Sequence, residues 1–227
     1  MTLQFRFVCA TRKTVAEFQN ESALGRSLGV LQNPVSSLRL YPENRLGLAA
    51  VYNQAIAEAA GESAVLVFAH DDIHLCDFYW PEHLATALEK FAIVGVAGNR
   101  RRVPRAPGWA FANEELVPDY DYLSGLVGHG DGFPPWNISH YGAAEVEVKQ
   151  LDGVFIVVRS QTLQESGLRF DERFHFHYYD MDFCRQAEGL GLSMGTATVS
   201  LVHESEGAYH SDAWRAEYRK YLEKWGD

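Results

Sequence analysis

A histidine and two adjacent carboxylates, His70, Asp71 and Asp72, directly follow the short apolar run Val65 to Ala69. An apolar run of this length with β-branched residues predicts a buried strand, and ligands of open α/β sheets collect beyond the carboxyl ends of such strands. Neighbouring carboxylates repel each other unless a cation, a proton or hydrogen-bond donors offset their charge. Oxygen-rich sites of this kind suit magnesium or manganese, so the sequence predicts a metal site at a strand tip.

Further acidic and imidazole side chains also fall at boundaries of predicted elements. They are Asp152, Asp180, Asp182 and His203. Each has a simpler interpretation when it is considered alone. The Asp71-Asp72 pair fits a helix cap and a solvated turn, Asp180 and Asp182 fit the positive end of a helix dipole, and His203 fits a hydrogen-bonded surface residue. Their shared position at element ends favours one common site.

The elements that must position these residues alternate along the first half of the chain. Apolar periodicity predicts strands at 5–10, 35–41, 65–69 and 93–97 and helices at 14–28, 44–60 and 77–91. Further strands are expected at 145–150, 154–158 and 194–202, and further helices at 162–166, 183–190 and after a Ser211 cap. The alternation predicts an α/β fold with a mostly parallel central sheet covered by helices on both faces.

Residues 98–144 interrupt this alternation. The segment is rich in Gly, Pro and aromatic residues, including Trp136, and few regular elements are expected in it. A long loop with this many aromatic residues is more typical of a binding lobe than of disorder. We therefore expect one domain over 1–227, with a ligand-binding half at 1–97, a second half at 98–205 that carries the loop 98–144, and a C-terminal helix within 206–227.

Composition excludes several classes of protein. The 227 residues are 47% hydrophobic and 22% charged, which is ordinary for a globular domain, and the formal net charge of −10 argues against a nucleic-acid partner. The only dense basic run is Arg100 to Arg102 with Arg105, which we interpret as a solvated loop. Three scattered cysteines favour a reduced, cytoplasmic setting. No apolar run approaches the length of a membrane span, although peripheral membrane contact stays open.

Six short motifs together resemble the family 2 glycosyltransferases of the GT-A fold, in particular a bacterial branch with a His-Asp-Asp variant of the Asp-x-Asp motif. The motifs, in chain order, are residues 44–53 (NRLGLAAVYN), 68–73 (FAHDDI), 151–153 (LDG), 170–174 (FDERF), 179–185 (YDMDFCR) and 202–205 (VHES). Each is short, but their order along most of the chain is specific for the fold and class. The resemblance is only weakly specific for the substrate.

The resemblance implies a divalent cation, Mn²⁺ or Mg²⁺, held against the diphosphate of a nucleotide sugar. Asp72 matches the last acid of the family motif, His70 replaces its first acid, and His203 matches a histidine that completes the metal shell in some relatives. Asp71 is assigned to the donor. A cation at this place stabilises the charge that develops on the nucleoside diphosphate leaving group.

The resemblance places Asp180 at the catalytic base, which takes the proton of the acceptor hydroxyl as that oxygen attacks the anomeric carbon. A single direct displacement implies inversion. The remaining members of this group are expected to contact the acceptor or the donor sugar, with Asp182 in a supporting role. They are Asp152, Gly153, Trp136, Tyr179 and Asp182.

The nucleoside side departs from the family pattern, because an acidic cluster is replaced by Pro42-Glu43-Asn44. We assign Thr11, Glu43, Asn44 and Asn53 to donor binding. Asn53 is equally well interpreted as a polar residue that packs its helix.

The resulting hypothesis is an inverting glycosyltransferase that moves a sugar from a nucleotide donor to a hydroxyl of a glycan or lipid-linked acceptor, in bacterial surface polysaccharide synthesis. One alternative is an inactive nucleotide-sugar-binding or glycan-binding module of the same fold. Another is a metal-dependent nucleotidyltransferase, although the chain has no Gly-x-x-x-x-Gly-Lys-Ser/Thr phosphate loop.

Overall fold

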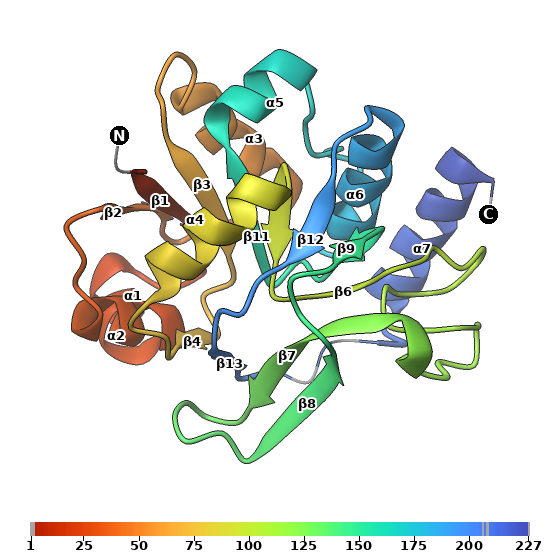
Figure 1. Ribbon diagram of the computed structural model, residues 1–227, viewed down its shortest axis with the longest axis horizontal. Coiled ribbons are helices and arrows are strands. Elements are labelled where there is room, and N and C mark those ends of the chain that lie inside the picture. The colour runs from red at the N-terminus through yellow and green to blue at the C-terminus, as the bar shows by residue number, and fades with distance from the viewer. Residues whose placement is uncertain (1–2, 206, 208, 227) are drawn as a thin grey trace.

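The computed structural model describes residues 3–205, 207 and 209–226, which form two sheets flanked by helices (Figure 1). The larger sheet has the strand order β2-β1-β3-β11-β5-β12-β9. Its strands are β1 (Phe5–Ala10), β2 (Ser36–Tyr41), β3 (Val65–Ala69), β5 (Ile93–Gly95), β9 (Glu147–Val148), β11 (Phe155–Arg159) and β12 (Met194–Thr196). The α/β class expected from the alternation is confirmed.

The larger sheet is mixed. β1 pairs in parallel with β2 and with β3, and β5 pairs in parallel with β12. β11 runs antiparallel to both β3 and β5, because the chain enters it from the second sheet and not through a crossover helix. The carboxyl end of β3, which carries His70, therefore lies beside the amino end of β11, which follows Asp152 and Gly153.

The second sheet has the strand order β10-β6-β7-β13-β4, and β8 pairs with β7. Its strands are β4 (Ile73–Leu75), β6 (Ala97–Asn99), β7 (Leu123–His129), β8 (Asn137–Gly142), β10 (Gln150–Leu151) and β13 (Leu201–His203). In Figure 1 the β7–β8 hairpin projects away from the main sheet.

Helices cover both faces of the larger sheet. They are α1 (Val15–Glu21), α2 (Ala23–Val30), α3 (Leu48–Glu58), α4 (Trp80–Lys90), α5 (Ser160–Ser166), α6 (Tyr179–Gly189) and α7 (Asp212–Trp225), with a 3₁₀ turn η1 at Tyr120–Tyr122. Successive side chains of β3 point to opposite faces of the sheet, so they pack in two separate hydrophobic cores. Leu66 and Phe68 pack with α3, α6 and α7, whereas Val65 and Val67 pack with α2 and α4.

Four expected elements are each divided in the structure. The strand expected at 93–97 is β5 and β6, the strand expected at 145–150 is β9 and β10, and the two parts of each belong to different sheets. The helix expected at 14–28 is two helices, because Ser22 ends α1 and its hydroxyl accepts the backbone N–H of Gly25 to cap α2. The strand expected at 194–202 is β12 and β13, which belong to different sheets. Because the chain leaves the larger sheet between these two strands, His203 at the end of β13 lies beside β4.

The segment 98–144 was expected to hold few regular elements, and this expectation is wrong. It contains the end of β6, η1 and the β7–β8 hairpin. Glycines break the alternating pattern of β7, and they do so for a packing reason. Gly125 has φ +100° and lies so close to the Val96 carbonyl that any side chain would collide with it.

The C-terminal helix expected within 206–227 is confirmed as α7 from Asp212, and Ser211 caps it by accepting the backbone N–H of Trp214. Residues 206, 208 and 227 of that range lie outside the described residues. No helix within the described residues is long and apolar enough to cross a membrane.

Candidate functional site

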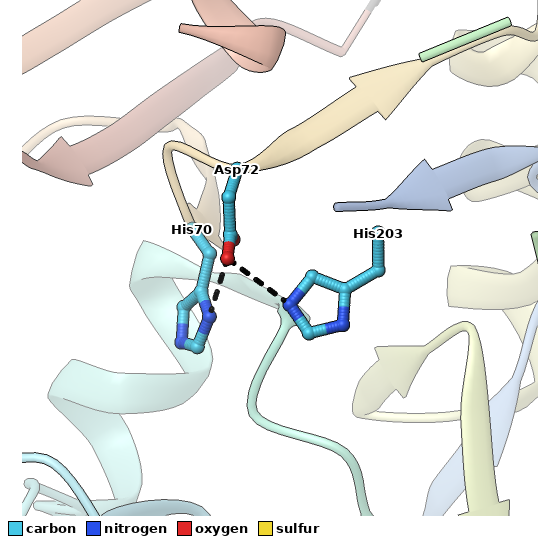
Figure 2. A group of neighbouring side chains, drawn as sticks. All are labelled: His70, Asp72 and His203. Atoms are coloured by element: carbon cyan, nitrogen blue, oxygen red, sulfur yellow. Dashed lines mark ion pairs between the residues drawn. The ribbon is translucent and has the colours of Figure 1, made fainter. Parts of the chain in front are cut away.

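The three expected metal ligands converge at one point, as Figure 2 shows. His70 follows β3, Asp72 precedes β4, and His203 ends β13, which pairs with β4 so that His203 lies opposite Ile73. The His203 Nε2 lies 3.4 Å from Asp72 Oδ2, and the His70 Nδ1 lies 3.8 Å from Asp72 Oδ1. One ligand atom from each residue lies within 4.8 Å of the others, so the three could share one cation.

Hydrogen bonds orient the His70 ring toward that point. The hydroxyl of Tyr179 donates to the Gly153 carbonyl at 2.8 Å, and the same hydroxyl lies 2.8 Å from His70 Nε2. Because the single hydroxyl proton is used on Gly153, Nε2 of His70 must carry the proton and donate. Burial lowers the pKa of His70, which favours the neutral ring, and its Nδ1 lone pair then faces Asp72.

The Asp72 carboxylate also fits a cation. Burial acts to raise the pKa of Asp72, but the hydrogen bond from His203 and the charge of that ring hold the pKa well below its usual range. Its Oδ1 is buried and has no hydrogen-bond partner among the described residues. A lone pair of His70 therefore faces an orphaned carboxylate oxygen, and a divalent cation would satisfy both. Carboxylates are typical ligands of Mn²⁺ and Mg²⁺, and imidazoles are typical ligands of transition metals.

Asp180 lies in the first turn of α6, and two backbone groups hold its carboxylate. Gly153 N–H donates to Oδ2 at 2.9 Å, and Met181 N–H donates to Oδ1 at 2.8 Å. Despite these donors, burial and then the charge of Asp152 raise the pKa of Asp180 to about 7. A carboxylate with this pKa is suited to general-base work near neutral pH.

Gly153 joins the two halves of the site. Its carbonyl accepts from Tyr179, which holds His70, and its N–H donates to Asp180. A Cβ at this position would collide with the Tyr179 hydroxyl and would lie 2.9 Å from the Asp180 Cβ. Glycine is therefore required for the approach of α6 to the strand tip.

One pocket of about 800 Å³ contains both halves of the site. His70, Asp72 and His203 line it together with Asp152 and Asp180. Further parts of its wall come from the segment 107–111, from β7 and β8, from the segment 176–181, and from Tyr120 and Tyr209. The volume is in the range of small-molecule sites, and the aromatic lobe expected at 98–144 contributes much of the wall.

The C-terminal helix holds the segment that leads into α6. The Glu217 carboxylate is 7% exposed and accepts the backbone N–H groups of His175, Phe176 and His177, at 2.8–3.4 Å. The Phe176 ring stacks on His70 with a centroid distance of 6.0 Å. Sequence analysis did not select Glu217, although a charged residue between Trp214 and Tyr221 on an apolar helix stripe was a usable signal.

Asp182 was expected in a supporting role at the acceptor or donor sugar, and its side chain lies outside the pocket wall. Its side chain is fully buried between α6 and α7, where Oδ1 accepts from Lys224 at 2.6 Å and from the Trp225 indole at 2.8 Å. The carboxylate thus fastens the C-terminal helix and does not face the pocket.

Asn53 and Trp136 also lie apart from the pocket wall. The Asn53 amide bonds to both backbone groups of Phe170 and to the Glu172 carboxylate, which matches its interpretation as a helix-packing residue. Trp136 is 75% exposed at the β7–β8 connection.

The residues assigned to the nucleoside gather at the carboxyl ends of β1, β2 and β3. The Thr11 hydroxyl donates to Asp71 at 2.5 Å, and the backbone N–H of Asn44 donates to the Thr11 carbonyl at 2.8 Å. Asn44 uses its side chain on the Leu46 backbone, and Glu43 is exposed at φ +49°. These residues are neighbours, but they are not part of the pocket wall that contains Asp180.

No protein-family model matches the chain, and no curated protein matches it in sequence. Similar solved structures include a Drosophila beta-1,4-galactosyltransferase 7 mutant in complex with manganese, UDP-Gal and xylobiose (TM-score 0.52, 8% identity, 96% of this chain and 80% of that one). GalNAc-T7 with UDP, GalNAc and Mn²⁺ has a TM-score of 0.53 at 13% identity over all of this chain and 48% of that one.

S. aureus TarS is similar at a TM-score of 0.50 and 14% identity, over 98% of this chain and 44% of that one. The chain thus spans less than half the length of GalNAc-T7 and TarS. Identities this low show the fold alone. The chain therefore has the GT-A fold of glycosyltransferases.

Proposed function

We propose that the protein is an inverting, metal-assisted glycosyltransferase that moves a sugar from a nucleotide donor to a hydroxyl of a glycan or lipid-linked acceptor. The observation that carries the proposal is the shared pocket. A three-residue ligand set at the strand tips and a carboxylate with a pKa near 7 line one cavity, and Tyr179 and Gly153 connect them by hydrogen bonds.

Asp180 is the proposed base. In the proposed step it takes the acceptor proton while the acceptor oxygen forms a bond to the anomeric carbon and the bond from that carbon to the diphosphate oxygen breaks. His70, Asp72 and His203 would hold a divalent cation, Mn²⁺ or Mg²⁺, which supplies charge stabilisation to the departing nucleoside diphosphate. One displacement of this kind inverts the anomeric centre.

Donor binding is assigned to the strand tips that hold Thr11, Glu43, Asn44 and Asp71. Asp152 and Gly153 lie between the ligand set and Asp180, where the transferred sugar and the acceptor must meet. We place the reaction in bacterial surface polysaccharide synthesis at the cytoplasmic side of the membrane, on the resemblance of the six sequence motifs.

A calorimetric titration with nucleoside diphosphates, with and without Mn²⁺, tests the donor part of the proposal. We expect binding to at least one nucleoside diphosphate, and we expect Mn²⁺ to tighten it. The Asp72→Asn variant should lose the effect of Mn²⁺, whereas Asp77→Asn, which removes an acid that pairs with His83 outside the pocket, should retain it. A folded protein that binds no nucleoside diphosphate under either condition would overturn the proposal.

Product analysis separates the proposal from its two alternatives. Incubation with a panel of nucleotide sugars, a panel of oligosaccharide acceptors and Mn²⁺ should release nucleoside diphosphate as the sugar bonds to an acceptor hydroxyl, and Asp180→Asn should abolish this release. Release of pyrophosphate would instead indicate nucleotidyl transfer. Binding without any turnover would indicate an inactive binding module.

A further inference from the structure

We infer that the part of the acceptor that enters the pocket is an uncharged glycan, without carboxylate, sulfate or phosphate groups. The inference rests on the proposed function and adds the chemical class of the acceptor. It depends on which side chains line the pocket and on where the basic side chains of the chain point.

Aromatic rings form much of the pocket wall. Those with accessible surface are Phe111, Tyr120, Tyr141, Phe176 and Tyr209. Some of them are held by other rings. Phe111 packs edge-on against Tyr209 at 5.2 Å, and Tyr141 packs edge-on against the buried Trp109 at 5.2 Å. Supported aromatic faces of this kind offer apolar surface to the C–H faces of sugar rings while sugar hydroxyls bond at the edges.

No lysine or arginine lines the pocket within the described residues, and those residues include every lysine and arginine of the chain. The charged groups that do line it are three aspartates, Asp72, Asp152 and Asp180, together with histidines. Carboxylate, sulfate and phosphate ligands are ordinarily bound by arginine or lysine. Here such a group would lose its hydration beside carboxylates and gain neither an arginine nor a lysine as a partner.

The dense basic run, Arg100 to Arg102 with Arg105, bonds to groups outside the pocket. Arg101 forms a two-pronged ion pair with Asp119 at 2.6 and 2.8 Å, and Arg105 pairs with Glu114 at 2.8 Å. Arg102 bonds to the Lys149 carbonyl and pairs with Glu188, and Arg100 bonds to the Asp121 carbonyl. The run lies in a loop, as expected, where Arg100, Arg101 and Arg105 are exposed, and its side chains form these bonds at the protein surface.

The charge of a bound divalent cation does not change this conclusion. That charge is matched by the donor diphosphate, which must lie against the same cation for transfer to occur. The formal net charge of −10 further disfavours approach of an anionic glycan at low ionic strength. An uncharged glycan fits this pocket best. Its sugar rings can pack on the aromatic side chains, and its hydroxyls can donate hydrogen bonds to the aspartate carboxylates.

The first test is a binding screen with matched pairs of oligosaccharides, for which neutral hexose oligomers and their uronate counterparts are the probes. The protein is saturated with Mn²⁺ and the nucleoside diphosphate that binds it. We expect the bound glycans to be uncharged, with affinities at least tenfold above those of their uronate partners. Equal or tighter binding of the uronates, or binding of neither class, would overturn the inference.

Substitutions in the pocket wall locate the binding. Tyr120→Ala should lower the affinity for a neutral glycan by about tenfold, which is the effect of one stacked ring. Tyr79→Ala is the matched control, because both tyrosines are 68% exposed and Tyr79 lies outside the pocket. Equal effects of the two substitutions would contradict the assignment of the aromatic wall.

Ile138→Lys adds the missing cation to the wall and should raise the affinity for uronate glycans at least fivefold. Leu126→Lys on the same hairpin, outside the pocket wall, should not. Nucleoside diphosphate binding in all of these variants separates the two proposals. If it persists while uronates are preferred, only the acceptor class is wrong, and if it is absent in the wild type the proposed function itself fails.

Discussion

Asp72 and Asp180 are aspartates of one pocket whose environments push their pKa values in opposite directions. Asp72 faces two imidazole rings at the strand tips, and its pKa is held well below the usual range. Asp180 has two backbone donors but lies buried beside Asp152, and its pKa rises to about 7. The first carboxylate is thus charged at every physiological pH, whereas the second can exchange a proton.

The difference shows how one residue type can fill two roles. A metal ligand must stay deprotonated, and imidazole neighbours favour that form. A general base must accept a proton and lose it again near neutral pH, and burial beside another carboxylate favours that behaviour. Gly153 and Tyr179 separate the two environments and also fix their relative position.

Asp180→Asn should have the largest effect on the difference between the two carboxylates, because it removes the proposed base and leaves the metal ligands in place. We expect the transfer rate to fall by about 10³-fold, the size of a lost general base, while Mn²⁺ affinity stays within twofold of the wild type. Rate measurements and metal titrations on the same preparation check both parts. A variant that retains more than a tenth of the wild-type rate would show that another group takes the proton.

The same substitution should change stability with a defined sign. Between pH 4 and 7 the native state of the wild type holds a proton on Asp180 that the unfolded chain has released, so stability falls as pH rises. Asp180→Asn has no such proton to lose, so its stability relative to the wild type should rise by about 3–4 kcal/mol from pH 4 to pH 8. At pH 4 it should be the less stable of the two, because its single amide oxygen replaces only one of two acceptors. Urea unfolding at the two pH values measures this.

Asp72→Asn should lower Mn²⁺ affinity by about 100-fold, since one of three ligands loses its charge. The Asp180 carboxylate should be unaffected, and its titration midpoint provides the control. Metal affinity equal to that of the wild type would place the cation away from His70, Asp72 and His203.

Glu217→Gln should reduce the transfer rate by about tenfold and the free energy of unfolding by about 1–3 kcal/mol. An amide has one acceptor oxygen for the backbone donors that the carboxylate serves, and the segment with Phe176 loses its anchor. If Glu217 positions the site, the fall should lie in kcat more than in KM, and Glu217→Asp should restore part of it. Glu223→Gln, on the exposed side of the same helix, should have no effect.

Asp152→Asn should have the smallest effect of these substitutions, and it tests why the pKa of Asp180 differs from that of Asp72. Removal of its charge should lower the pKa of Asp180, so the rising limb of the pH profile of kcat/KM should move to a lower pH by up to about one unit. An unchanged limb would show that burial alone sets the pKa of Asp180.

The set of metal ligands at the strand tips could be predicted from the sequence, because these residues stand where predicted strands begin or end. His70, Asp72 and His203 follow or precede apolar runs, and parallel and antiparallel pairing brings such ends together. The pairing that places His203 beside β4 required the split of the expected strand 194–202, which apolar periodicity does not reveal.

The direction of individual side chains could not be predicted in the same way. Asp180 and Asp182 are two positions apart, and on a helix such residues point about 200° apart. One therefore faces the pocket while the other is buried under α7. The resemblance ranks Asp180 above Asp182, but the expected helix starts only at Phe183, so the opposite directions of the two carboxylates follow only from the helix start at Tyr179.

The most direct test of the account is a ¹³C NMR titration of the aspartate carboxyl carbons, with Asp180→Asn used to assign the Asp180 signal. The account predicts a midpoint for Asp180 near pH 7 in the wild-type protein. A midpoint near pH 4, the ordinary value for an exposed aspartate, would contradict its assignment as the base of the transfer reaction.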